Sequence, residues 1–523
     1  MAEVPVYQGD VSNSTTQGAA VLQAMAYLDE VKYTILLALL GSALHFYMKR
    51  PKGAPPGPNG LPVLGYAPYL GPRPHEKLVE VGKTYGNIFS IYIGQKLTVI
   101  LNDYEAITKA YIDNADAVAN RDPGFAHKVL NGSEHDTRVR GLTMTNGEQW
   151  RTMRRFALTT LRNLGMGKSR LQERILEEVD HLTDTLRKKD GQVVEADELM
   201  IESIANVMFA VTLGKRFDHA DPNFKVIIDF LVIALPTLSN VGPIQLFPWL
   251  RKFGKFKRFW DTFLRDMGSW KRVFRDELAA HAEVQETDEP YDYVSAFRQQ
   301  QLREAKLGQN MSYFDEDELL VDLSNLFGAG AETTATTITW AFYFMVLNPD
   351  IQRKTQAILD AKVERNRNVT MDDRAELPYV EAMYQEVQRL GNVVPLNIAR
   401  SAAEDLTVLG YRIPKGTFII SNLWNIHRDP RYWDTPEQFI PERFLDDEGH
   451  LRTPPYFMPF SIGKRHCPGE SLARMEVFLF VTNVLQKFTL RVPEGFDLRP
   501  PEEYVNGLTA RPPPFRIVFE PRA

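Results

Sequence analysis

The sequence predicts one large, mainly α-helical domain with small β-sheets (α+β class) behind an N-terminal membrane anchor. Helical periodicity dominates from about residue 148 to residue 390. Short strand-like runs flank it: residues 88–102 read as a β-hairpin around Gly94, and residues 406–422 and 515–521 as further strands. A hydrophobic content of 44% and a charged content of 24% fit a folded globular chain. Mixed but mostly helical architecture follows from this pattern.

The N-terminus is predicted to tether this domain, residues 63–523, to a membrane. Within the expected anchor, 31–48, the run from Tyr33 to Met48 contains no Asp, Glu, Lys or Arg, and basic residues follow at once. The run is shorter than the roughly 20 residues of a spanning helix, but it can borrow a turn from either end. The alternative is an ordinary buried helix. Acidic residues ahead of the run argue against a cleaved signal peptide.

The charges after the run predict the orientation of the chain. Basic residues on its C-terminal side place the large domain in the cytosol. Residues 1–30 then form a short lumenal segment, in which Asn13 begins a glycosylation sequon. The proline-rich residues 49–62 read as a stiff hinge. We therefore expect a lumenal tail, an anchor, a hinge and one large catalytic domain.

The totals exclude two classes of protein. A net charge of −6 gives no support to nucleic-acid binding. One cysteine in 523 residues excludes an intramolecular disulfide framework and suggests a reducing compartment.

That single cysteine, Cys467, lies in the segment FSIGKRHCPGESLARMEVF, ahead of a helical pattern in which Pro468 suits the first turn. At a helix N-terminus the amides of Gly469 and Glu470 can donate to a thiolate, which predicts a lowered thiol pKa. Gly463 and Gly469 let the backbone approach something flat. Taken alone, a lone cysteine is more often a small buried apolar residue.

A second feature is an apolar helix whose only charge between Asn325 and Leu347 is Glu332. A transmembrane span is one interpretation. Glycines and threonines in its middle predict instead a core helix that is weakened there, because threonine hydroxyls bond preceding carbonyls. Glu332 and Thr333 are expected beside a cavity.

A third feature is the pair Glu386 and Arg389, which are three residues apart and so share one helix face. Such a pair is usually a surface salt bridge. Here the acid borders an apolar stripe that includes Val387 and Leu390, which favours a buried structural ion pair.

With these residues the chain resembles the cytochrome P-450 superfamily of haem-thiolate monooxygenases, and in particular animal microsomal enzymes of the second clan. The resemblance covers about nine-tenths of the chain. Four motifs carry it: the cysteine loop, the acid–threonine helix, the Glu-x-x-Arg pair with its third member in PERF, and the WRTMRRF helix. Their residues are Phe460, Gly463, Arg465, Cys467 and Gly469; Ala329, Gly330, Glu332, Thr333 and Thr334; Glu386, Arg389 and Arg443; Trp150 and Arg154.

The resemblance implies a cytochrome P-450 fold that binds haem b, with Cys467 as the axial thiolate ligand of the iron. It implies that Glu332 and Thr333 supply protons during oxygen activation, although they could merely cap a helix kink. The triad of Glu386, Arg389 and Arg443 would be structural. The residues implied to bind the cofactor are Trp150, Arg154, Arg400, Phe460, Arg465, Cys467, Gly469 and Arg121.

The resemblance also implies partners and a location. Electrons would come from NADPH through NADPH-cytochrome P-450 reductase, with cytochrome b5 as a further candidate, at the endoplasmic reticulum membrane. The basic character near Trp150 would dock the reductase. The interleaved aromatic and basic residues 244–264 suit a patch that dips into lipid headgroups, although about half of them are expected in the core. The basic residues in question are Arg151, Arg155, Arg162 and Lys168.

The substrate is predicted only as a lipophilic molecule that is hydroxylated or epoxidised, such as a steroid, fatty acid or foreign compound. The expected pocket segments are 125–141, 232–245 and 393–398 with Leu508, and they carry few polar groups, such as Asn325 and Asn397. Two alternatives stay open. A haem-thiolate isomerase or dehydratase would often lack the acid–threonine pair, and a non-enzymatic haem-binding membrane protein would consume no NADPH.

Overall fold

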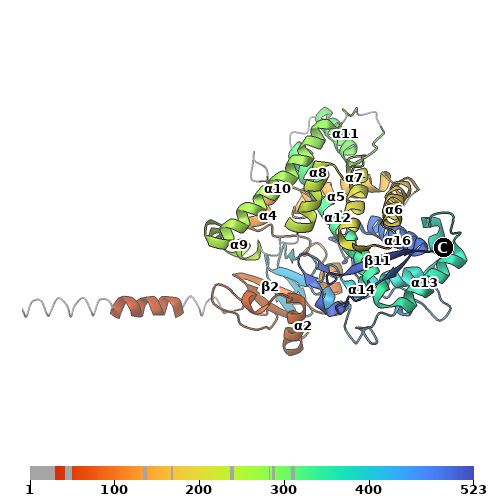
Figure 1. Cartoon of the computed structure of the whole chain (residues 1–523). Helices are drawn as coiled ribbons and strands as arrows, with labels where there is room; N and C mark the ends of the chain where they lie inside the picture. Colours follow the sequence, from red (N-terminus) through yellow and green to blue (C-terminus); the bar gives the residue numbers. More distant parts are fainter. Residues whose placement is uncertain are drawn as a thin grey trace, which may run out of the picture.

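The computed structural model describes residues 30–41, 50–132, 138–165, 169–235, 241–281, 283–285, 289–307 and 313–522. Residues 30–41 are helical and stand away from the main body in Figure 1, with exposed apolar side chains such as Leu37 and Leu39. The rest of the predicted anchor and Asn13 lie outside the described residues. Among the helices that are described, none is long and apolar enough to span a membrane.

The main body is helical in its larger part, as predicted, with short 3-10 or π turns between the helices (Figure 1). The α-helices are α2 (Pro74–Tyr85), α3 (Tyr104–Thr108), α4 (Phe125–Leu130), α5 (Gly147–Asn163), α6 (Ser169–Lys189), α7 (Ala196–Thr212), α8 (Pro222–Asp229), α9 (Gly242–Leu246), α10 (Gly254–Ala280), α11 (Tyr293–Lys306), α12 (Glu316–Leu347), α13 (Pro349–Lys362), α14 (Pro378–Gly391), α15 (Leu423–Ile426) and α16 (Glu470–Lys487). The short turns are η1 (Ala67–Tyr69), η2 (Lys109–Asp113), η3 (Phe230–Ala234), η5 (Pro248–Lys252), η6 (Met371–Glu376), η7 (Pro441–Phe444) and η8 (Pro501–Glu503).

Within the described residues the strands form four small sheets. The predicted hairpin at residues 88–102 is confirmed as the antiparallel pair β1–β2, with Gly94 at positive φ. The sheet orders are β1-β2-β7-β4, β3-β11-β8, β5-β6 and β10-β9. The strands are β1 (Ile88–Ile93), β2 (Lys96–Leu101), β3 (Val193–Glu195), β4 (Arg400–Ser401), β5 (Leu406–Val408), β6 (Tyr411–Ile413), β7 (Phe418–Ser421), β8 (Phe488–Arg491), β9 (Val505–Asn506), β10 (Ala510–Arg511) and β11 (Arg516–Pro521).

Helix α12 is the centre of the core. It packs against α7, α14 and α16, and the largest hydrophobic cluster surrounds these four helices. Asp315 caps its first turn by accepting a hydrogen bond from the amide of Glu318 at 2.7 Å. Its burial confirms a core helix of a large domain rather than a lone apolar span.

The threonine bonds expected in α12 are present: Thr333 and Thr337 donate to the carbonyls of Ala329 and Thr333, at 2.7 and 2.8 Å, within a helix that runs from Glu316 to Leu347. One local expectation about these helices is wrong. Helix α16 begins at Glu470 with Gly469 as its N-cap, so Pro468 precedes the helix and does not occupy its first turn.

Candidate active site

The cysteine loop, residues 460–469, lies between the segment that contains η7 and the start of α16. It closes on itself through hydrogen bonds from the Cys467 amide to the Phe460 carbonyl and from the His466 amide to the Gly463 carbonyl, both 3.0 Å. Gly463 has φ +76°, and a Cβ there would lie 2.2 Å from the carbonyl oxygen of Tyr111. Only glycine therefore fits, because η2 presses its backbone against the loop.

The environment of the Cys467 thiol differs from the expectation. Burial raises the pKa of Cys467, whereas hydrogen bonds from the Gly469 and Glu470 amides and the charge of Arg154 act to lower it. The two predicted amide donors are therefore in place. The predicted net lowering is wrong, because in the protein itself desolvation of the thiolate outweighs these donors.

Four guanidinium groups, the arginine cluster of Arg121, Arg154, Arg400 and Arg465, meet beside this loop. Arg465 donates to the carbonyls of Ala119 at 2.7 Å and Thr145 at 2.6 Å, and it lies 3.9 Å from the ring centroid of Trp150. Three segments that are far apart in sequence, before α4, at the start of α5 and before α16, are thus joined at one point.

The other three members of the cluster are also tied to main-chain oxygens. Arg154 donates to the His466 carbonyl at 2.5 Å, and Arg121 donates to the Thr143 carbonyl at 2.6 Å. Arg400 donates to the Ile462 carbonyl at 2.6 Å and lies 3.4 Å from the ring centroid of Tyr111. The carbonyl contacts orient the cations but do not neutralise them.

The arginines of the cluster lower one another's pKa values. Burial, followed by the charges of Arg121, Arg154 and Arg400, lowers the pKa of Arg465 to about 8. Burial and the neighbouring Arg400 and Arg154 likewise lower the pKa of Arg121 to about 9, although Tyr111 acts the other way. The pKa values of Arg154 and Arg400 are lowered, first by burial.

This cluster is built for an anionic group. Among the described residues, no carboxylate pairs with any of the four cations. Within the part of the chain that the structure describes, the buried Nε of Arg121, the Nε and Nη1 of Arg400 and the indole Nε1 of Trp150 have no hydrogen-bond partner. Unpaired buried donors of this kind call for acceptors, and the two propionates of haem supply acceptors and two negative charges. The residues present therefore fit haem.

Helix α12 packs against α16, the helix that follows the cysteine loop. In its middle, Ala329 is exposed and Gly328, Gly330 and Thr333 are partly exposed, whereas Ala331, Glu332 and Thr334 are buried. The buried carboxylate of Glu332 accepts from Arg511 at 3.0 and 3.1 Å, from Thr336 at 3.3 Å and from Thr509. The sequence placed Glu332 and Thr333 together, but their side-chain hydrogen bonds go to different partners.

The Glu386–Arg389 pair is buried, as predicted, and Arg443 joins it as a third member. Both side chains are 0% exposed, and Nε and Nη2 of Arg389 bind the two Glu386 carboxylate oxygens at 2.6 and 2.8 Å. Arg443 Nε binds the same carboxylate at 3.2 Å, and the amide of Ile440 donates to it at 2.8 Å. Arg389 also donates to three carbonyls, so the triad fastens α14 to the segment that contains η7.

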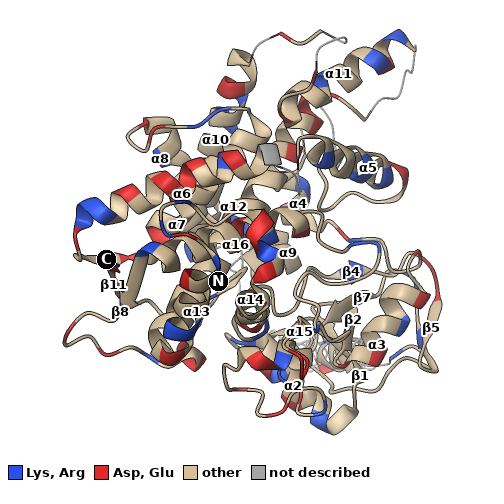
Figure 2. Cartoon of the chain, turned by 90° about the vertical axis from the view of Figure 1, so that its right-hand side faces the viewer, with Lys and Arg blue, Asp and Glu red and all other residues tan. Residues whose placement is uncertain are grey.

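The predicted basic face lies on α5, where blue positions are visible in Figure 2. Arg151, Arg155 and Arg162 are exposed there, and Lys168 lies outside the described residues. Because the neighbouring Arg154 contacts the carbonyl of His466, this exposed face adjoins the cysteine loop. Lys464 of that loop extends the face and pairs with Asp116.

Two of the predicted pocket segments, 125–141 and 232–245, contact each other where they are described, and the third, 393–398, contacts the cysteine loop. The amide of Ala126 donates to Gln245 at 2.7 Å, which joins α4 to α9, and Asn325 of α12 accepts from the Thr143 amide at 3.2 Å. Asn397 donates to Ser461 of the cysteine loop at 2.6 Å. Residues 133–137 and 236–240 of these segments lie outside the described residues.

The aromatic segment 244–264 divides between surface and core. Trp249 and Phe253 are 58% and 60% exposed, whereas Trp260 is buried and packs with Phe125. The expected mixture of surface and core residues is confirmed.

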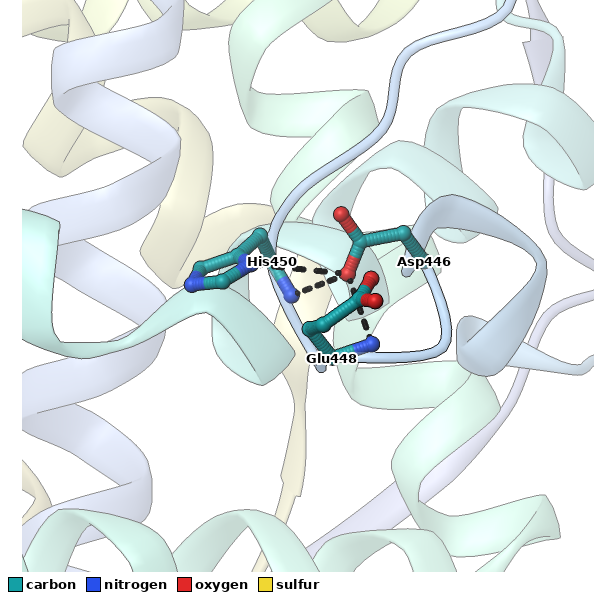
Figure 3. A group of neighbouring side chains, drawn as sticks. All are labelled: Asp446, Glu448 and His450. Atoms are coloured by element: carbon teal, nitrogen blue, oxygen red, sulfur yellow. Dashed lines mark hydrogen bonds and ion pairs between the residues drawn. The ribbon is translucent and has the colours of Figure 1, made fainter.

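One further group of candidate metal ligands, Asp446, Glu448 and His450, forms a surface turn (Figure 3). Asp446 accepts from the amides of Glu448 at 3.1 Å and His450 at 2.8 Å. These turn-closing bonds account for the arrangement without a metal ion.

Sequence reasoning missed the partners that complete these sites. Tyr111 and Ser461 contact Arg400, and Thr509 and Arg511 bind Glu332. Ser461 stands within the cysteine motif and could have been suspected. Tyr111, Thr509 and Arg511 belong to remote segments and carry no local signal.

Comparison with known proteins agrees with this geometry. The family model described as "Cytochrome P450" matches residues 55–519. The chain is 35% identical to cytochrome P450 2J2 of Homo sapiens over 496 residues, which cover 94% of this chain and 96% of that protein. It is 33% identical to cytochrome P450 2U1 of Mus musculus over 512 residues, with 93% and 94% covered. It is 34% identical to cytochrome P450 2F2 of Rattus norvegicus over 501 residues, with 93% and 98% covered.

Family membership settles the cofactor that the arginine cluster and the cysteine loop fit, and it settles the reaction class. The haem is haem b, and the reducing equivalents of NADPH arrive through a reductase. The predicted resemblance to animal microsomal enzymes is confirmed. The chain belongs to the cytochrome P450 family and is a monooxygenase.

Proposed function

We propose that this protein inserts one oxygen atom of O2 into a lipophilic substrate at a haem whose iron is bound by Cys467. A C–H or C=C bond is oxidised, and the second oxygen atom leaves as water. NADPH is oxidised to NADP⁺, and NADPH-cytochrome P-450 reductase carries its two electrons. The arginine cluster beside Cys467 is the observation that carries this proposal.

The protein's own groups would hold the cofactor from two sides. Arg121, Arg154, Arg400 and Arg465, with the indole N–H of Trp150, would bind the propionates by charge-assisted hydrogen bonds. Gly463 lets the loop lie close to η2, and the carbonyl of Phe460 accepts a hydrogen bond from the Cys467 amide. These two contacts hold the thiolate in a fixed position. When bound, the haem supplies oxygen activation, and a thiolate ligand favours O–O cleavage.

Proton supply would depend on α12. We assign it to Glu332 and the hydroxyl of Thr333, which are consecutive residues of this helix; the carboxylate is buried, and the hydroxyl lies on the partly exposed face. Thr333 donates to the Ala329 carbonyl, so its hydroxyl oxygen remains able to accept a hydrogen bond from the exposed face.

The substrate would enter between α4, α9 and the residues around Leu508, and an apolar molecule suits these walls. Leu508 is 43% exposed and Ile398 38% exposed, and both side chains are apolar. A steroid, a fatty acid or a foreign compound meets this description.

We place the protein at the endoplasmic reticulum membrane. The apolar run at residues 33–48 and the exposed Trp249 and Phe253 support this location. The exposed arginines of α5 would dock the reductase, and cytochrome b5 would compete for the same face.

The test is the reduced, CO-bound absorption spectrum of the purified protein beside Cys467→Ala. We expect a red-shifted thiolate band in the wild type and its loss in the variant. Ser471→Ala, an exposed position four residues further on, serves as the control and should keep the band. An imidazole-type band in the wild type, or an unchanged band in Cys467→Ala, would refute the assignment.

A further inference from the structure

The carboxylate of Glu332 is held by a hairpin from the far end of the chain. Both Nε and Nη2 of Arg511, in β10, bind one Glu332 oxygen at 3.1 and 3.0 Å, and the hydroxyl of Thr509 bonds to the same oxygen. The pair spans 179 residues of sequence. A buried acid of α12 is thus paired with a cation from outside its helix.

The hairpin that carries these two residues is itself fixed. The amide of Ala510, between them, donates to the Val393 carbonyl at 2.8 Å, and its carbonyl accepts from the indole of Trp340 at 2.9 Å. Trp340 is on α12, so helix and hairpin are joined at two levels. Thr509 and Arg511 therefore meet Glu332 as a preorganised pair and not as freely moving surface groups.

The two side chains of this ion pair differ in their exposure to solvent. The Glu332 side chain is 3% exposed, whereas that of Arg511 is 21% exposed. The guanidinium therefore connects the buried carboxylate with solvent. The partly exposed face of α12 that carries Ala329 and Thr333 is a separate face of the helix.

From this arrangement we infer that Arg511 and Thr509 are positioning residues for Glu332 and mark the solvent end of its proton route. The inference rests on the proposed role of Glu332 in proton supply. Arg511 orients the carboxylate and provides the polar border at which water can reach it. Leu508, next to Thr509, belongs to the proposed substrate walls, so one hairpin serves both the pocket and the proton route.

The proton balance is simple. Each proton that Glu332 gives up is replaced by one proton from solvent at the Arg511 side, so the carboxylate is an anion again after each transfer. Reduction of O2 to H2O2 takes two electrons and two protons, and reduction to two waters takes four of each. When protons arrive slowly, partly reduced oxygen is released as H2O2 before the four-electron reduction is complete.

This difference gives a test that needs no known substrate. The full-length holoenzyme, with reductase in phospholipid vesicles, oxidises NADPH while H2O2 release is measured. For Arg511→Leu we expect the share of NADPH electrons that reaches water to fall by about tenfold, and a similar fall for Glu332→Gln, since a positioned acid or base typically contributes at least that much. Arg511→Lys, which keeps the charge, should restore most of it.

A matched control comes from the neighbouring strand. Arg516 pairs with Glu195 across 3.8 Å at the surface, with 59% and 66% of the two side chains exposed. Arg516→Leu removes an arginine from the same part of the chain, and it should leave the electron share unchanged. Thr509→Val, which removes only one hydroxyl, should lower the share of NADPH electrons that reaches water less than Arg511→Leu does. This variant also tests the inference if Arg511→Leu does not fold in sufficient yield.

A second readout does not depend on turnover. The melting temperatures of Glu332→Gln, Arg511→Leu and the double variant form a cycle. If the pair exists, the losses are non-additive, and the double variant melts no lower than Arg511→Leu alone, because it leaves no unpaired buried carboxylate.

Two results would overturn the inference: additive losses in melting temperature, or non-additive losses with H2O2 release no greater than in Arg516→Leu. The second result would leave the pair a purely structural contact. The CO-bound spectrum of each variant separates this outcome from failure of the proposed function, because a wild type without a thiolate band refutes haem ligation by Cys467 whatever the cycle shows.

Discussion

At the scale of single residues, buried charge organises this protein in two opposite ways. In the arginine cluster, four cations are held by carbonyl oxygens without a carboxylate, which keeps them available for an anionic cofactor. In the triad, both arginines pair with the carboxylate of Glu386 within the protein. A buried cation with no internal counter-charge indicates a ligand, and a complete buried network indicates structure.

The triad gives the first prediction. Glu386→Gln should lower the free energy of unfolding by about 3–5 kcal/mol, because Arg389 and Arg443 would remain buried without a counter-charge. Chemical unfolding of the holoenzyme measures the loss. Glu376→Gln is the control, since its pair with Lys362 at 3.2 Å is 71% and 49% exposed and is worth under about 1 kcal/mol. Equal losses in the two variants would contradict the structural role.

At the scale of elements, α12 is joined to the segment before α5 by a second buried acid. Glu318 accepts from the Gly141 amide at 2.8 Å and from Gln149 at 3.0 Å. Burial raises the pKa of Glu318 from 4.5 to about 7, and these hydrogen bonds act against that rise. Burial, followed by the charge of Glu318, also raises the pKa of Asp322, one turn further along.

This junction predicts a pH dependence of stability. The folded state binds the Glu318 proton more tightly than the unfolded state, so stability falls as the pH rises from about 4.5 to about 7, by on the order of 3 kcal/mol at most. Glu318→Gln, which keeps an acceptor oxygen and carries no charge, should remove this part of the slope and gain stability relative to the wild type at pH 8. Urea unfolding at pH 5 and pH 8 measures both effects.

The exposed Glu316, also in the first turn of α12, provides the comparison, and Glu316→Gln should keep the wild-type slope. If Glu318→Gln shows the wild-type slope as well, the raised pKa is not a property of this junction.

At the scale of the whole molecule, the arrangement of α5 against the cysteine loop exposes the face that we propose for the reductase. The helix turns Arg154 inward to the loop and leaves Arg155 exposed on the same side of the domain. The net charge of −6 therefore conceals a local basic face.

For this face we expect Arg155→Glu to weaken association with the reductase by about tenfold at 0.01 M salt and by much less at 0.1 M, because the Debye length falls from about 30 Å to about 10 Å. Titration of reductase at the two ionic strengths, followed by NADPH oxidation, provides the measurement. Lys188→Glu makes the same charge change at an exposed position near the end of α6 and should have little effect. A loss that does not depend on salt would point to a local packing defect.

Features that depend on near neighbours in the chain could be predicted from the sequence alone. Hydrophobic periodicity predicted the helices and the β1–β2 hairpin, and fixed spacing predicted the cysteine loop, the Glu386–Arg389 pair and the acid–threonine pair. The motifs also identified the members of the arginine cluster, although only through the resemblance to a family. Such patterns are readable because the backbone geometry brings residues three or four apart onto one helix face.

The contacts between remote segments could be identified only from the tertiary structure. Tyr111 beneath Arg400, and Thr509 and Arg511 on Glu332, join parts of the chain separated by more than 170 residues, and no local period encodes such contacts. The pKa of Cys467 was misjudged for the same reason: the nearby amides are visible in the sequence, whereas the burial that outweighs them is a sum over the whole fold. Spacing along the chain fixes which groups are present, and packing fixes which of their charges are compensated.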